Sequence, residues 1–279
     1  MQAIGSETNA VYHESGKMLH GSLENIMGTR FEVLMIGLYK RKSHEVWNET
    51  VHELRRLDRV FNRFDEGSET SKINREAAST PVHVSPEMWA ILQNCRDYHT
   101  RTKGLFDITL NDFNTVIMDA NENSVAFSKN NLTLDFGGYA KGYALAKIKE
   151  LLLQNGIEHC FVDFGNSSIL GMGHHPHGDS WKVSVRDPYH PDATLGELSL
   201  HDQALSVSGN SPAYNGHIVL PDSGLAVNAR KVASIISKDP LDAEVLSTVF
   251  MMANEEEKEW LTKEFKIEIE QVAEYIIQE

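Results

Sequence analysis

The chain has 279 residues, of which 41% are apolar and 24% charged, and its formal net charge is −14. This composition is typical of a globular protein with enough chain for a packed core. The acidic excess argues against a general nucleic-acid binder and against an anionic membrane surface as partner. Two cysteines, Cys95 and Cys160, are too few for a disulfide framework, which is compatible with a reducing compartment.

The sequence shows no membrane anchor. No segment approaches the roughly 20 consecutive apolar residues of a membrane helix, so we expect no membrane insertion. The first 20 residues are polar, without the apolar core of a signal peptide or a cysteine for lipid attachment. We therefore expect a cytoplasmic protein, or a periplasmic one if the natural N-terminus is longer than the printed one.

The first part of the chain predicts a strand followed by helices. Residues 1–21 are expected to be a loose or extended lead-in, and residues 22–279 a single domain. Phe31–Tyr39 is rich in residues that favour extended structure, so it predicts a strand. Ser43 is expected to cap a helix that runs to about Phe61, because apolar residues recur there at helical spacing.

The remaining elements favour an α+β fold. A short helix is expected to start at Ser71, and Ser85-Pro86 to open another that runs to about Lys103. A helix is predicted near Leu241, and the acidic stretch Glu255–Gln278 is predicted to be helical, with a later piece that could be a strand. Short strands are expected at Val125–Phe127, Leu132–Leu134, Cys160–Phe164, Lys182–Val185, Ala204–Ser208 and Lys231–Ile236. Strands and helices mix without a regular βαβ order, which indicates mixed or antiparallel sheets with packed helices.

The stretch from Leu134 to Ala144 predicts a phosphate site. It places Asp135, the glycine pair Gly137-Gly138 and Lys141 directly ahead of a helix pattern that ends at Asn155-Gly156. Glycines let a backbone approach a ligand closely, and a helix start offers unpaired N–H groups to an anion. A strand-to-helix turn that simply needs glycine explains the same residues.

Two acids are further candidates, each with a structural alternative. Glu244 and Thr248 lie four residues apart, so on a helix a carboxylate and a hydroxyl share one face and could bind Mg²⁺. A solvated helix face would show the same spacing. Asp107 lies between apolar residues, either as a buried carboxylate held for a ligand hydroxyl or as a loop acid that caps a turn.

Three polar segments complete the candidates. Ser206–Ser211 is a small polar turn that could offer hydroxyls and N–H groups to an anion, or could be only a turn. His217 stands before an apolar run, either as a structural hydrogen-bonded group or as a base. His174–His177 lacks the i, i+4 spacing of a helical metal site and is expected to be an exposed loop.

The order of these motifs along the chain resembles the ApbE family of FAD:protein FMN transferases, from about residue 25 to about residue 255. The motifs are Met27-Gly28-Thr29, Glu69–Asn74, Gly104–Asp107, Asp135–Ala144, Ser208-Gly209, His217 and Glu244–Thr248. The resemblance implies an ApbE-like α+β architecture related to the T-fold, with FAD as substrate and Mg²⁺ as cofactor. It also implies transfer of FMN from FAD to a threonine or serine hydroxyl of a partner flavoprotein, with release of AMP.

The resemblance also implies roles for individual residues. The metal ligands would be the backbone carbonyl of Gly138 and the side chains of Glu244 and Thr248. His217 would be the catalytic base, and Asp107 a second catalytic residue. The residues that would line the FAD site are Met27, Phe64, Leu105, Phe106, Asp107, Asp135, Lys141, Ser208 and Ile218.

The chain departs from the family pattern at several positions. Glu244 stands where the family usually has aspartate, and Asn166 where a second glycine is common. After His217 the family continues with Asp-Pro, a basic residue and Thr-Gly, whereas this chain has Leu220–Gly224. The connections from Asp107 to Asp135 and from Ser208 to His217 are shorter than usual. Three alternatives therefore remain: an FAD-binding protein without transfer activity, an FAD pyrophosphatase that releases FMN and AMP, and a domain whose likeness is only ancestral.

Overall fold

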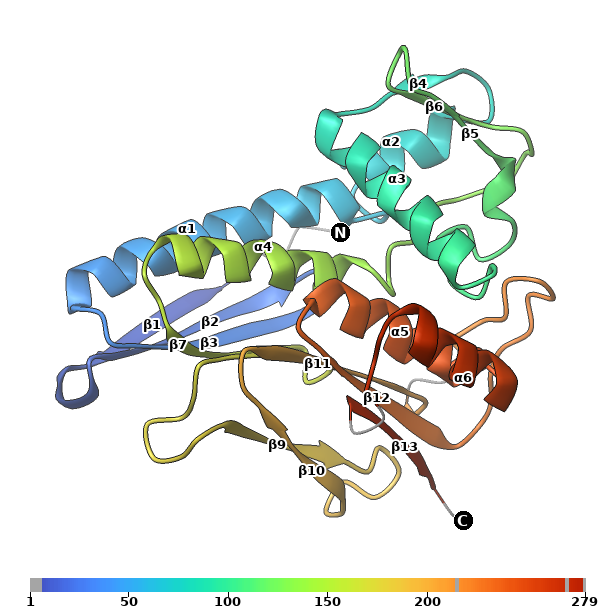
Figure 1. The fold of residues 1–279 in the computed structure, drawn as a ribbon. Coiled ribbons are helices and arrows are strands. Elements are labelled where there is room, and N and C mark those ends of the chain that lie inside the picture. The colour runs from blue at the N-terminus through green and yellow to red at the C-terminus, as the bar shows by residue number, and fades with distance from the viewer. Residues whose placement is uncertain (1–6, 214–215, 269–270, 278–279) are drawn as a thin grey trace.

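The computed structural model describes residues 7–213, 216–268 and 271–277, and its centre is an eight-stranded antiparallel sheet (Figure 1). The strand order is β1-β2-β3-β7-β8-β11-β12-β13, so strands from the two ends of the chain form the two edges. The bounds are β1 Thr8–His13, β2 Met18–Ile26, β3 Thr29–Ile36, β7 His159–Phe164, β8 Ser168–Met172, β11 Gln203–Gly209, β12 Lys231–Ser237 and β13 Val272–Ile276.

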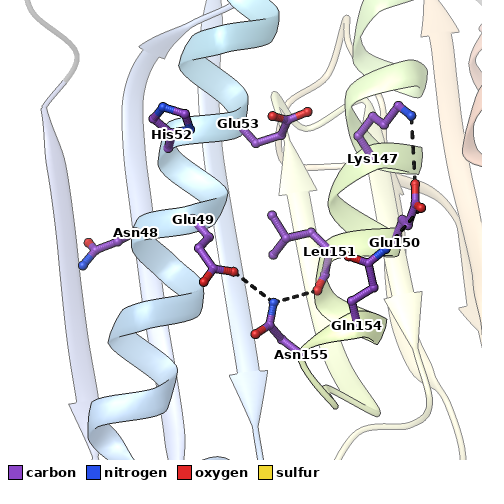
Figure 2. Close-up of a pocket in the computed structure, with 9 residues that line it drawn as sticks. All are labelled: Asn48, Glu49, His52, Glu53, Lys147, Glu150, Leu151, Gln154 and Asn155. Atoms are coloured by element: carbon purple, nitrogen blue, oxygen red, sulfur yellow. Dashed lines mark hydrogen bonds and ion pairs between the residues drawn. The ribbon is translucent and has the colours of Figure 1, made fainter.

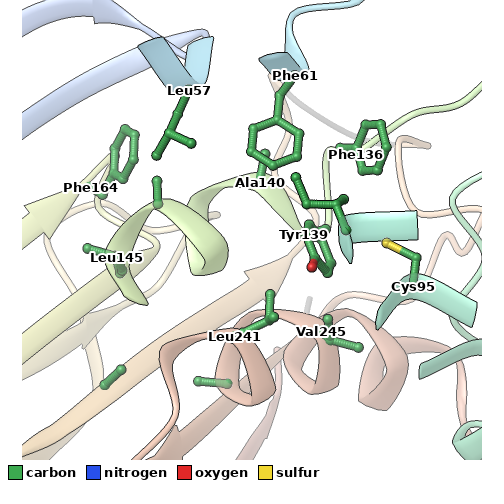
Figure 3. Packing of buried hydrophobic residues seen from close by; sticks show 14 of the residues in the cluster. Leu57, Phe61, Cys95, Phe136, Tyr139, Ala140, Leu145, Phe164, Leu241 and Val245 are labelled. Atoms are coloured by element: carbon green, nitrogen blue, oxygen red, sulfur yellow. The ribbon is translucent and has the colours of Figure 1, made fainter. Parts of the chain in front are cut away.

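Three helices cover one face of this sheet. They are α1 (Lys40–Phe61), α4 (Ala140–Gln154) and α5 (Pro240–Met252), and α6 (Glu255–Glu264) follows α5 (Figure 1). α1 packs on β2, α4 on β8, and α5 on β11 and β12. Their buried apolar side chains and the inner face of the sheet form the main core, part of which Figure 3 shows around Tyr139. None of the helices in the described parts of the chain is long and apolar enough to cross a membrane.

A hairpin covers part of the opposite face. It consists of β9 (Trp181–Arg186) and β10 (Thr194–Leu200). Neighbouring residues of one strand point to opposite faces of a sheet. Ile169 packs with Trp181 in the hairpin cluster, whereas Leu170 belongs to the main core. Every residue of β8 is therefore buried, while buried and half-buried residues alternate along β7.

A smaller layer lies beyond one end of α1 (Figure 1). It contains α2 (Glu69–Glu76), α3 (Pro86–Arg101) and a three-stranded sheet of order β4-β6-β5, with bounds Val82–His83, Ser124–Phe127 and Val116–Asp119. The hydroxyl of Ser68 accepts from Ser71 N (3.0 Å), so α2 begins before the predicted start. The hydroxyl of Ser85 accepts from Met88 N (3.1 Å), so Ser85 caps α3, which begins at Pro86 as expected.

The α+β class is confirmed, but three expectations about local structure are wrong. Ser43 does not cap α1, because the helix begins at Lys40 after Tyr39, and the hydroxyl of Ser43 donates to the carbonyl of Tyr39 (3.1 Å) within the first turn. Of the loose or extended lead-in expected at residues 1–21, the loose alternative is wrong from Thr8 on, because β1 pairs with β2 over Thr8–His13 and Met18–Leu23. Residues 1–6 lie outside the described residues. The lead-in is polar because β1 is an edge strand with four of its six residues exposed, which hides the sheet pairing from a hydrophobicity pattern.

The predicted strand Leu132–Leu134 is also wrong. This segment pairs with no other strand in the described structure. Instead the side-chain amide of Asn74 forms hydrogen bonds with both backbone groups of Leu134. Its Nδ2 donates to the carbonyl (3.0 Å), and its Oδ1 accepts from the N–H (2.7 Å). A side chain therefore satisfies the hydrogen bonds that a neighbouring strand would otherwise supply.

The helices α4 and α5 approach each other closely at Gly142. A Cβ atom added at Gly142 would lie 2.5 Å from Glu244 Cβ and 2.9 Å from the carbonyl oxygen of Pro240. Only a residue without a side chain fits there, so Gly142 determines how near the two helices lie. This approach brings the N-terminal turns of α4 against the polar side chains of α5.

We predict that Gly142→Ala lowers the free energy of unfolding by about 1–2 kcal/mol, because overpacking costs about 1–3 kcal/mol and alanine's helix propensity returns at most about 1 kcal/mol. The measurement is the urea midpoint. Gly178→Ala is the matched control, since its nearest neighbour would be 3.9 Å away. A Gly142→Ala protein as stable as the wild type would contradict the tight contact.

Candidate functional site

Polar side chains from four elements meet where α4 and α5 cross the sheet. Lys141 comes from the first turn of α4 and Glu244 from α5, while Ser168 begins β8 and Ser208 lies near the end of β11. Lys141 Nζ lies 2.8 Å from Glu244 Oε1. Residues that are more than 100 positions apart in the sequence thus form one ion pair inside the protein.

Glu244 is buried, with 4% of its surface exposed, and both of its carboxylate oxygens have partners. Oε1 pairs with Lys141. Oε2 accepts from Ser168 Oγ at 2.6 Å and from Ser206 Oγ at 2.9 Å. The alternative of a solvated helix face is therefore wrong, because a carboxylate this deep needs a counter-ion and hydrogen-bond donors.

A row of hydroxyl groups continues from Glu244 to Thr248. Ser247 Oγ lies 3.0 Å from Ser206 Oγ and 2.8 Å from Ser208 Oγ, and Ser208 Oγ lies 3.2 Å from Thr248 Oγ1. Ser206 and Ser208 share one face of β11, since residues two apart point the same way in a strand. The sequence pattern missed Ser168 and Ser247. The signal in the sequence was weak: Ser168 stands at the start of one apolar run, and Ser247 lies inside another.

Gly138 and Thr248, two of the three residues predicted as metal ligands, lie next to each other. A Cβ atom added at Gly138 would lie 3.5 Å from Thr248 Oγ1, so the backbone of Gly138 faces that hydroxyl. Thr248 follows Glu244 by one turn of α5. A carbonyl, a carboxylate and a hydroxyl supply only oxygen, which fits a small hard cation such as Mg²⁺. No group of three or more His, Cys, Asp or Glu residues in the described ranges could hold a metal.

Asp135 lies in the turn that leads to α4. Its Oδ1 accepts from Gly137 N at 2.8 Å, and its Oδ2 lies 3.1 Å from Arg63 Nη1. The guanidinium of Arg63 also stacks on the ring of Phe64, 4.8 Å from the ring centre. Phe64 itself is 83% exposed. Asp135 and Phe64, which were both predicted to line the FAD site, are thus connected through Arg63.

Asp107 is enclosed by its own loop. Its Oδ1 accepts from Thr109 N (2.7 Å) and Thr109 Oγ1 (2.6 Å), and its Oδ2 accepts from Phe113 N (2.8 Å). His99 Nδ1 lies 3.5 Å from Oδ2 on the other side. The side chain of Asp107 is 1% exposed, so the described structure favours the loop-acid alternative over contact with a substrate.

The other predicted FAD contacts differ in how accessible they are. Phe106 is buried, and its ring centre lies 5.8 Å from that of Tyr98. Ile218 is also buried. Leu105 is half-buried at the edge of the main core. Met27 is half-buried in a turn with φ +48°, where its N–H donates to Asp58 Oδ1 at 3.2 Å.

His217 lies on the surface at the start of a short hairpin. The N–H of Val227 donates to the carbonyl of Ile218 (2.8 Å), and the N–H of Leu220 donates to the carbonyl of Leu225 (2.9 Å). Partial burial of the imidazole lowers the pKa of His217 below its usual value. The ring is therefore held mainly in its neutral form at pH 7, as a base requires.

Two other polar regions lie apart from these residues. His174–His177 is an exposed loop, as expected. A groove between α1 and α4 is lined by polar side chains that bond one another: Asn155 Nδ2 donates to Glu49 Oε2 (3.0 Å), and Lys147 lies 4.0 Å from Glu150 (Figure 2). None of the predicted site residues lines this groove.

Comparison with known proteins identifies the family. The model of the ApbE family matches residues 27–117 and 110–272. The chain belongs to the ApbE family. Two solved ApbE structures share its fold: the flavin transferase ApbE from Vibrio cholerae (TM-score 0.77, 18% identity, 97% of each chain) and the ApbE protein from Thermotoga maritima (TM-score 0.75, 21% identity, 97% of this chain and 93% of that chain).

Curated relatives in sequence are named FAD:protein FMN transferase. The protein from Chlamydia trachomatis is 26% identical over 182 residues, which cover 55% of this chain and 55% of that protein. The protein from Chlamydia muridarum is 22% identical over 248 residues, which cover 74% of this chain and 76% of the relative. The match to the first of these spans only about half of its length.

We predict that Asp107→Ala lowers the free energy of unfolding by about 2–4 kcal/mol, because it leaves buried N–H groups at Thr109 and Phe113 without an acceptor. Urea unfolding measures this. Asp119→Ala is the control, since that exposed acid also accepts from a backbone N–H two residues on, and it should cost less than about 1 kcal/mol. Unchanged stability with lost FAD affinity would instead assign Asp107 to the ligand.

Proposed function

We propose that the protein transfers FMN from FAD to a threonine or serine hydroxyl of a partner flavoprotein, and that the reaction needs Mg²⁺. The observation that carries this proposal is the meeting of Lys141, Glu244 and Thr248 beside the backbone of Gly138. The name FAD:protein FMN transferase, borne by relatives of this ApbE-family chain, supports the choice of reaction.

The proposed reaction breaks the phosphoanhydride bond of FAD and forms a phosphoester to the acceptor. The acceptor oxygen forms a bond to the phosphorus of the FMN half, the bond from that phosphorus to the bridging oxygen breaks, and AMP leaves. His217 takes the proton of the attacking hydroxyl, because its neutral ring is a base. Lys141 and the α4 N-terminus bind the phosphate oxygens. Bound Mg²⁺ would neutralise charge on the pyrophosphate.

A second candidate is FAD binding without transfer. It is favoured by the engagement of both Glu244 oxygens, which leaves neither one free for a cation as the side chains stand. In that case FAD binds tightly and without turnover, and Glu244→Ala leaves its affinity unchanged. Release of AMP in the absence of any acceptor would instead select the FAD pyrophosphatase alternative.

Transfer is tested by incubating the protein with FAD, Mg²⁺ and several flavoproteins that carry accessible threonine or serine residues. Mass spectrometry should find FMN covalently bound to an acceptor, with one AMP released for each. We expect His217→Asn to lower the rate at least about 100-fold, because loss of a general base costs about 10²–10⁴. His201→Asn, an exposed histidine on the hairpin side of the sheet, is the matched control and should retain full activity. Absence of modified acceptor with every flavoprotein would refute transfer.

The rate of transfer should depend on pH through His217. Burial disfavours the charged imidazolium, so the neutral base persists to a lower pH than the ordinary pKa of about 6.5 allows. We therefore expect the rate to fall on the acidic side with a midpoint below about 6.5. The measurement is the initial rate at saturating FAD across pH 5–8. A midpoint clearly above about 6.5 would assign the acidic limb to another group.

A further inference from the structure

The ammonium group of Lys141 uses all three of its hydrogen-bond donors inside the site. Nζ lies 2.8 Å from Ser167 Oγ, 2.7 Å from Ser168 Oγ and 2.8 Å from Glu244 Oε1. A lysine has three N–H donors and no acceptor, so none of them is left for a ligand in this arrangement. The same side chain was predicted to contact the dinucleotide, which it can do only by giving up one or more of these partners.

The oxygens of Glu244 are divided between two kinds of partner. Ser168 and Ser206 hold Oε2 through neutral hydroxyl groups, whereas Oε1 contacts Lys141. A cation held by Glu244 would therefore take the place of Lys141 at Oε1. The ammonium and a divalent cation repel each other, so the two cannot share this oxygen at low cost.

We propose that Lys141 is an exchangeable counter-ion of Glu244. The negative phosphates of the dinucleotide draw the ammonium away from Oε1, and the departure of the lysine opens that oxygen to a divalent cation. The dinucleotide and the cation then bind cooperatively through one side chain. The inference rests on the proposed function only in taking FAD as the ligand that carries the phosphates.

The surroundings of the pair allow this exchange. The side chain of Lys141 is 21% exposed, whereas that of Glu244 is 5% exposed, so the lysine has a route towards solvent and the glutamate has none. The flexible four-carbon stem of a lysine can swing while its helix stays in place. When the lysine leaves, Ser168 and Ser206 still donate to Oε2, so the buried carboxylate keeps two of its three partners.

The test measures binding of Mn²⁺ to the full chain by electron paramagnetic resonance, with no nucleotide present. We expect Lys141→Met to tighten Mn²⁺ binding roughly tenfold, in the range typical of coupled sites, because the competing ammonium is gone. Lys147→Met on the same helix is the matched control, because it removes the same charge from a residue that lies 4.0 Å from Glu150 and 5.5 Å from the ring centre of Tyr143. It should leave Mn²⁺ affinity unchanged. In the wild type, FAD should tighten Mn²⁺ binding, and this effect should shrink in Lys141→Met.

A second variant keeps the test informative if thermal unfolding shows that Lys141→Met is poorly folded. Ser167→Ala removes one partner of the lysine and none of the partners of Glu244, so it should tighten Mn²⁺ binding in the same direction but less. Unchanged or weaker Mn²⁺ binding in the well-folded variant, or equal tightening in Lys147→Met, would overturn the inference. Because no acceptor is present, a protein that fails to transfer FMN can still show these shifts, so the two proposals fail separately.

Discussion

The close contact between α4 and α5 at Gly142 is the constraint on which the rest of the site depends. Because a Cβ atom at this position would meet Glu244 Cβ at 2.5 Å, the first turns of α4 lie directly against the polar side chains of α5. The contact places Lys141 within reach of Glu244, and it lets the backbone of Gly138 face Thr248. A larger residue at position 142 would separate the helices and the oxygen atoms that they carry.

The same contact removes the carboxylate of Glu244 from water, and burial of a charge is costly unless it is paired and hydrogen-bonded. The protein meets this requirement with one ammonium group and two hydroxyls, which come from α4, β8 and β11. The oxygen atoms around Glu244 are of the kind that bind a hard cation, but the positive charge that balances the carboxylate comes from a lysine. Lys141 therefore has two roles in this ApbE-family protein: it neutralises a buried carboxylate, which stabilises the fold, and it belongs to the site for which we propose the transfer chemistry.

Part of this structure could be predicted from local sequence, and particular residues show why the remainder could not. The start of α3 at Pro86 followed from a proline in the first turn of the helix, which is a purely local signal. The strand expected at Leu132–Leu134 failed, because its hydrogen bonds go to Asn74, a residue about 60 positions earlier. The edge strand β1 was missed since edge strands carry little apolar signal. For Asp107 the sequence could not separate a ligand contact from a loop acid that caps a turn. The three hydrogen bonds that it accepts from Thr109 and Phe113, which are visible only in the structure, favour the loop acid.

The sequence by itself determined the α+β class, the family resemblance, and the identity of groups that the structure brings together: Gly138, Lys141, Glu244 and Thr248. These depend on residue type, order and spacing, which are local properties. The tertiary structure alone decided which groups touch. It paired Lys141 with Glu244 and placed Ser168, Ser206 and Ser247 around them. The physical reason is that burial of a charge selects its partners by distance in space, and the pairing of β8 with β11 and the packing of α4 on α5 create those distances.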